Sequence, residues 1–157
     1  MITIKECKTA DTRTATELVS KEVLLSSSLQ HIEDIEKAMY WMADMLKDAS
    51  CNHDFTKLNN INQFHSDCID CQLDNIKNFK TMKWFQLHIT EERHHLQEHV
   101  SADVNLFDVL EFIADNVMAG LARTGTVRNC TLPDGLLESA YTNTIALLNK
   151  NVEVVKQ

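Results

Sequence analysis

The segment 28-SLQHIEDIEKAMYWMADMLKDA-49 decides the fold, because it contains no Gly or Pro and its polarity repeats with a helical period. Apolar side chains lie about one turn apart along it, at Ile35, Ala38, Met42, Met45 and Ala49. This spacing is typical of a helix that packs one face against the rest of a protein. We therefore predict one long helix here. His31 lies one turn before Ile35, so we expect its side chain to point inward from the same face.

Similar patterns on both sides of this segment predict further helices. Only 3 Gly and 1 Pro occur among 157 residues, which leaves few turns for a many-stranded fold. Ser27 and Gln30 fit a capping box that starts the central helix. Helical patterns also cover residues 14–25, 56–71, 81 onward, 106–121 and 131–149, and a short strand fits residues 2–4. The chain is therefore predicted to be an all-α bundle of about six to seven helices.

We predict a single domain over residues 1–157, because no repeat or low-complexity segment divides the chain. Within it, residues 1–27 form an N-terminal extension with a helix of its own. Residues 28–123 carry the helices of the site, and residues 131–157 carry a C-terminal helix.

Charge and hydropathy exclude several classes of partner. The net charge is −8, the pI is about 5.3, and no Lys/Arg-rich run is present, so a nucleic-acid polymer is a poor fit. No apolar run is long enough to span a bilayer, and the N-terminus lacks the apolar core of a signal peptide. We expect a cytoplasmic protein that does not enter membranes. A small phosphorylated molecule stays compatible with the acidic chain if bound metal supplies positive charge.

Residues able to bind metal recur in separate segments of the chain. The dipeptide His53-Asp54 follows the long helix, and imidazoles or carboxylates recur at His88, His94-His95 and Asp115. Mixed imidazole and carboxylate ligands suit Mn, Fe, Ni, Co, Zn or Mg, and sites with two such ions are common in hydrolases. We predict one or two divalent ions, with Asp54 bridging them when there are two.

The order His, His-Asp, His, His-His, Asp resembles that of the HD-domain superfamily. The resemblance is closer to a phage and bacterial branch of it, and it lies in His31, "HDFTK", "HITEERHHLQE" and "DVLEFIAD", which together span roughly residues 28 to 123. The spacings from His88 to His94-His95 and from Glu111 to Asp115 also match.

The resemblance implies roles for these residues. The core metal ligands would be His31, His53, Asp54 and Asp115. A second metal would be held by His88 together with one of His94 or His95, while Lys57 and Arg93 would contact phosphate oxygens. The chain has Leu96-Gln97 where the family has Pro-Glu. Without that proline the helix is free to run to Val100, which leaves the choice between His94 and His95 open.

The resemblance also implies an activity. It points to a metal-dependent phosphohydrolase acting on a small phosphate ester, with a nucleotide as one candidate and with Asp54, Lys57 and Arg93 as catalytic residues. Two alternatives stay open: an HD-like di-iron oxygenase, and a non-catalytic phage-encoded binding protein on the same scaffold, in the host cytoplasm. A homo-oligomer is compatible with each of them.

Three local motifs favour other interpretations. "HLQEH", from His95 to His99, fits the inverted zinc-protease motif, although such proteases are much larger. "EERHH" contains two E-x-x-H pairs, so Glu91 and Glu92 are candidates to orient a metal-binding histidine. "CIDC", from Cys68 to Cys71, is a lone C-x-x-C without a second pair, and we interpret it as helix packing.

Overall fold

The computed structural model describes residues 1–7, 19–74 and 77–156 of the chain. It is mostly helical, which confirms the predicted all-α class in outline, and it adds one short pair of parallel strands. The chain divides into two compact units, Met1–Met45 with Ile145–Gln157 and Leu46–Thr144. Among the described residues, no helix has the length and apolar character needed to cross a membrane.

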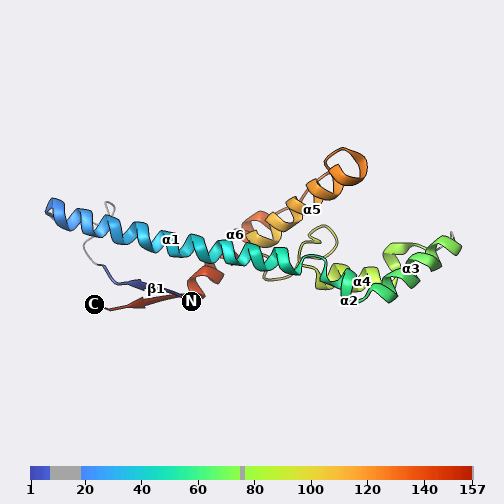
Figure 1. The fold of residues 1–157 in the computed structure, drawn as a ribbon, viewed down its shortest axis with the longest axis horizontal. Coiled ribbons are helices and arrows are strands. Elements are labelled where there is room, and N and C mark those ends of the chain that lie inside the picture. The colour runs from blue at the N-terminus through green and yellow to red at the C-terminus, as the bar shows by residue number, and fades with distance from the viewer. Residues whose placement is uncertain (8–18, 75–76, 157) are drawn as a thin grey trace. The chain divides into compact units, whose positions relative to one another are not determined.

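The first unit is built on two strands from opposite ends of the chain (Figure 1). Strand β1 (Ile2–Lys5) pairs in parallel with β2 (Val152–Val155), with Ile2 opposite Val152. Parallel strands need a long crossover, and here the crossover contains the whole second unit. Helix α1 (Lys21–Asn52) is tied to β1 by Gln30, whose Nε2 donates to the Lys5 carbonyl at 2.8 Å.

Helix α1 differs from its prediction in two ways. It is continuous from Lys21, so the break between residues 25 and 28 and the capping box of Ser27 and Gln30 are wrong, and the described residues form one helix where two were predicted. Ser27 is buried inside the helix instead. The predicted inward stripe is also wrong in part, because His31 and Ile35 are exposed. Residues 14–18 of the predicted first helix lie outside the described residues.

The second unit begins where α1 ends. Asp54 has a φ of 59°, a left-handed conformation that turns the chain sharply into α2 (Phe55–Asn59). Helix α3 (Ile61–Leu73) follows after Asn60, so the single helix predicted over 56–71 is divided there. Leu58 and Ile61 are exposed.

Helix α4 (Lys83–Glu91) follows a short 3-10 turn, η1 (Phe79–Thr81), and stops before the double histidine. The predicted continuation to Val100 is wrong, because Glu92 takes an extended conformation. The side chain of Trp84 holds α4 against α3 by stacking on Phe64 with ring centroids 3.8 Å apart. Because α4 ends at Glu91, the chain after Glu92 can fold back over α4.

Helix α5 (Leu106–Thr124) starts with a capping box. The Asn105 side chain accepts from the backbone N–H groups of Phe107 and Asp108, and Asp108 Oδ2 accepts from the Asn105 N–H at 2.9 Å. Helix α6 (Leu136–Lys150) then leads into β2. The core of this unit is formed by the loop before α5, one face of α5 and the start of α6. It consists of Leu96, Val104, Val109, Phe112, Leu136 and Ala140.

Leu96 is fully buried in that core, so shortening it tests the packing of the loop that carries the double histidine. We expect Leu96→Ala to lower the free energy of unfolding by about 2–5 kcal/mol, because it leaves a cavity. Leu137→Ala, at a half-exposed position on α6, is the control and should change it by less than about 0.5 kcal/mol. Urea denaturation measures both, and equal effects would contradict this core.

Candidate metal centre

The Asp54 carboxylate lies at the centre of a cluster of imidazoles. Its Oδ1 is 3.5 Å from His88 Nε2 and 3.7 Å from His94 Nε2, and its Oδ2 is 3.4 Å from His53 Nε2. Lys57 Nζ donates to Oδ2 from one turn further along the chain. Burial raises the pKa of Asp54, but the Lys57 ammonium and the nearby histidines outweigh it and lower that pKa below its usual value. The carboxylate is therefore held in its charged form.

One oxygen of this carboxylate lacks a hydrogen bond. Asp54 Oδ1 is buried and, within the described part of the chain, has no hydrogen-bond partner. A buried charged oxygen without a partner is costly, and a cation placed between it and the facing Nε2 atoms would remove that cost.

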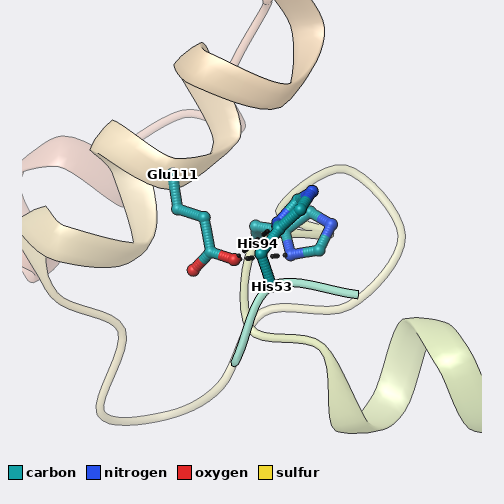
Figure 2. Close-up of side chains that lie close together, drawn as sticks. All are labelled: His53, His94 and Glu111. Atoms are coloured by element: carbon teal, nitrogen blue, oxygen red, sulfur yellow. Dashed lines mark hydrogen bonds and ion pairs between the residues drawn. The ribbon is translucent and has the colours of Figure 1, made fainter. Parts of the chain in front are cut away.

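His53 is oriented by the acidic face of α5. Its Nδ1 donates to Glu111 Oε1 at 2.9 Å, which leaves the Nε2 lone pair directed toward Asp54 and, at 3.8 Å, Asp115 Oδ1. Figure 2 shows Glu111 reaching from its helix toward the rings of His53 and His94. Glu111 and Asp115 lie four residues apart, so they share one face of α5.

His94 contacts the same Glu111 oxygen. Its Nδ1 is 3.1 Å from Glu111 Oε1, but the two atoms are not aligned as a hydrogen bond. Among the described residues, His94 Nδ1 has no hydrogen-bond partner. Burial lowers the pKa of His94, but Glu111 and then Asp54 and Asp115 outweigh it, so the pKa is raised. The negative charge around His94 therefore favours a bound positive charge, whether proton or metal.

A buried relay orients His88. The Oγ1 of Thr56 lies 2.6 Å from Glu92 Oε1 and 2.6 Å from His88 Nδ1. A carboxylate only accepts hydrogen bonds, so the hydroxyl hydrogen goes to Glu92 and the Thr56 oxygen accepts from the Nδ1–H of His88. The Nε2 lone pair of His88 then faces Asp54. Glu92 therefore orients the His88 ring through Thr56, which is the kind of support that "EERHH" predicted for Glu92.

His95 completes this side of the cluster. Its Nε2 lies 2.8 Å from His88 Nε2, so in the metal-free protein His95 donates to the His88 lone pair. Burial lowers the pKa of His88 to about 3, with smaller effects from His95 and Lys57, and burial also lowers the pKa of His95. Both imidazoles are therefore neutral at neutral pH, which is the form that binds metals.

Among the described residues, three groups of ligand atoms come close enough to hold an ion, with all atoms in each group within 4.8 Å of one another. They are His53, Asp54 and Asp115; Asp54, His88 and His95; and His53, His94 and Glu111. Asp54 belongs to two of the groups, which fits the predicted bridging position. The imidazole and carboxylate donors fit the divalent ions expected from the sequence.

The second unit contains all but one of the predicted site residues, and Arg93 is the member of this set that contacts Asp103 and Asp108 and not the Asp54 cluster. The unit contains His53, Asp54, Lys57, His88, Arg93, His94, His95 and Asp115. His31 lies on α1 in the first unit with an exposed side chain, and its role as a ligand stays a prediction. The rings of His94 and His95 both reach the cluster, because α4 ends before them, and the choice of which one binds a metal stays a prediction.

Two residues of the site were missed by the sequence patterns. Glu111 was noted only for its spacing from Asp115, although that i, i+4 spacing on one helix also predicts a shared face. Thr56 had no signal of its own, since its role depends on the sharp turn at Asp54. The inverted zinc-protease motif loses its basis, because His95 and His99 lie in turns after α4 and not on a helix.

Arg93 makes its contacts at the start of the loop that follows α4 and carries His94 and His95. Its Nε and Nη2 donate to the two Asp108 carboxylate oxygens at 2.8 Å, and its Nη1 donates to Asp103 at 3.0 Å. Asp108 is almost fully buried and also caps α5, so this fork ties the double-histidine loop to the start of α5. These contacts support a structural role, and phosphate binding by Arg93 stays a prediction.

Comparison with models of protein families, with curated proteins and with solved structures gives no match to this chain. The function must therefore be inferred from the site itself.

Thr56 tests the relay. Thr56→Val removes the hydroxyl at nearly constant size, so in metal-free protein His88 should lose its preference for the Nδ1–H tautomer. Metal affinity should fall about 10–100-fold, as for other losses of a group that orients a ligand. Thr56→Ser keeps the hydroxyl and should retain both properties. Nitrogen-15 NMR of the imidazoles reports the tautomer, and an unchanged tautomer in the valine variant would contradict the relay.

Arg93 is tested by a charge-conserving change. Arg93→Lys keeps the charge but loses the fork on Asp108, so we expect a loss of about 1–3 kcal/mol in unfolding free energy with metal content retained. Arg123→Lys, at an exposed position near the end of α5, serves as the control. Unchanged stability combined with lost phosphate turnover would instead favour the phosphate-binding role.

Proposed function

We propose that this chain is an HD-like, metal-dependent phosphohydrolase that acts on a small phosphate ester with one or two divalent ions bound around Asp54. One observation carries the proposal: the buried Oδ1 of Asp54, which has no hydrogen bond from the described residues, faces the Nε2 atoms of His88 and His94. The ligands would be the Nε2 atoms of the clustered histidines with the carboxylates of Asp54 and Asp115. The resemblance of the ligand order to HD domains supports the same class.

The proposed chemistry follows from the groups present. A divalent ion in such a site polarises a phosphoryl oxygen and lowers the pKa of its bound water. Lys57 is half-exposed beside Asp54, so its ammonium is accessible to a phosphate at the rim of the cluster and would neutralise charge on a non-bridging oxygen. Glu111 and Thr56 hold the imidazoles of His53 and His88 in place. Binding a metal would require little rearrangement of His53 and His88, because hydrogen bonds already orient their imidazole rings.

Replacing Asp54 tests the ligand role. We expect Asp54→Ala to lose bound metal and phosphatase turnover together, because it removes the carboxylate shared by two of the ligand groups. Asp48→Ala removes an exposed carboxylate six residues earlier, on the last turns of α1, and should retain both. Elemental analysis of protein purified without chelator measures metal per chain. Full activity of the Asp54 variant would refute the proposal.

A substrate screen separates this proposal from its alternatives. The metal-loaded protein is assayed against a panel of phosphate esters, nucleotides included, with the metal found by elemental analysis and with Mn, Co, Ni and Mg. Phosphate release that depends on the metal supports a hydrolase. Iron with oxygen consumption would favour the oxygenase, and ligand binding without turnover across the panel would favour the binding protein.

A further inference from the structure

A cleft of about 330 Å³ opens beside the ligand cluster, within the second unit. The last turns of α1 form one wall and α5 forms the other. Its lining consists of Leu46, Ala49, Ser50, His53, Leu110, Glu111, Ala114, Asp115 and Met118. This volume lies at the lower end of the range for small-molecule sites. The cleft therefore has room for a compact group next to the candidate ligands.

Helical spacing explains why the cleft has two chemically different parts. Leu46 and Ala49 share one face of the last turns of α1, with His53 directly after the end of that helix. Leu110, Ala114 and Met118 share one face of α5. The polar part consists of His53, Glu111 and Asp115, which are also members of the ligand groups. The rest of the lining is apolar except for Ser50. A molecule in this cleft would thus place one end at the ligand cluster and the other against aliphatic side chains.

Charge restricts which end of a molecule each part accepts. None of the described residues that line the cleft is Lys or Arg, and two of them are carboxylates. An anionic phosphate is therefore excluded from the apolar part and needs the cations bound at the cluster and the Lys57 ammonium. A nucleobase or ribose would bury several polar groups against Leu46, Leu110 and Met118, where they would lack hydrogen-bond partners. The aliphatic wall instead favours a neutral, apolar group.

We propose that this cleft binds the apolar alcohol portion of a phosphate monoester, an aryl or short alkyl group, whose phosphate lies at the His53 and Asp115 end. This inference rests on the proposed phosphohydrolase function and narrows its substrate class. In the reaction, a water oxygen forms the new bond to phosphorus and the bond from phosphorus to the ester oxygen breaks. A proton from that water ends on the leaving alcohol oxygen, so the products are the free alcohol and inorganic phosphate.

Filling the cleft tests this assignment. Ala114 is exposed on the cleft face of α5, so Ala114→Phe should be tolerated by the fold while it occupies the apolar part. We expect it to raise the KM for 1-naphthyl phosphate about tenfold or more, with metal content unchanged. Ala122→Phe adds the same ring two turns further along α5, outside the cleft, and should leave the KM unchanged. Met118→Ala, which shortens the apolar wall, should also raise the KM.

Comparison of substrates gives a second readout. The unmodified protein should have a higher kcat/KM for 1-naphthyl phosphate than for adenosine monophosphate, and Ala114→Phe should reduce the difference. Preference for the nucleotide, or an unchanged KM in both cleft variants, would overturn the inference while leaving the hydrolase intact.

Sedimentation of the same variants gives a further check. Dissociation of a dimer by Ala114→Phe without a change in KM would assign the cleft to a contact between copies and overturn the inference.

Direct binding separates failure of the inference from failure of the proposed function. If the metal-loaded protein hydrolyses no phosphate ester, calorimetry with 1-naphthyl phosphate still measures occupancy of the cleft. Binding that Ala114→Phe weakens, and Ala122→Phe does not, would support the cleft as a ligand site without a hydrolase. The absence of binding would overturn it.

Discussion

The site depends on one partly buried carboxylate, that of Asp54, held by a backbone that turns left-handed. Asp54 sits at the junction of α1 and α2 with a φ of 59°, a conformation that Asp adopts more readily than most residues with a side chain. This turn directs the carboxylate toward the imidazoles of His53, His88 and His94. Because Asp54 Oδ1 is buried and receives no hydrogen bond from the part of the chain that the structure describes, the local structure favours a bound cation at this point.

The rest of the second unit positions the groups around that carboxylate. Helix α4 ends before the double histidine, and the loop that follows is fixed by the burial of Leu96 and by the Arg93 fork on Asp108. Glu111 on α5 and the pair of Thr56 and Glu92 then hold the Nδ1 sides of the rings. The Nε2 atoms are left facing inward, which is the arrangement that a metal centre requires.

From the sequence, the kinds of side chain in the site were easier to predict than the backbone turns and strand pairing around it. His53, Asp54 and Asp115 could be found because imidazoles and carboxylates recur at the ends and faces of helical patterns. The Asn105 cap was also readable, since its partner Asp108 lies three residues on. The end of α4 was not, because no Gly or Pro marks it and tertiary contacts of the following loop decide it. The strand β2 was missed for a similar reason: its partner β1 lies at the other end of the chain.

The most direct test is to locate the ion. A metal-loaded crystal measured at the absorption edge of the bound metal gives its position by anomalous scattering. We expect an ion about 2.0–2.2 Å from an Asp54 oxygen and from at least one inward-facing Nε2 of His53, His88 or His94. An ion bound elsewhere, with the Asp54 carboxylate outside its coordination sphere, would contradict the proposed metal centre.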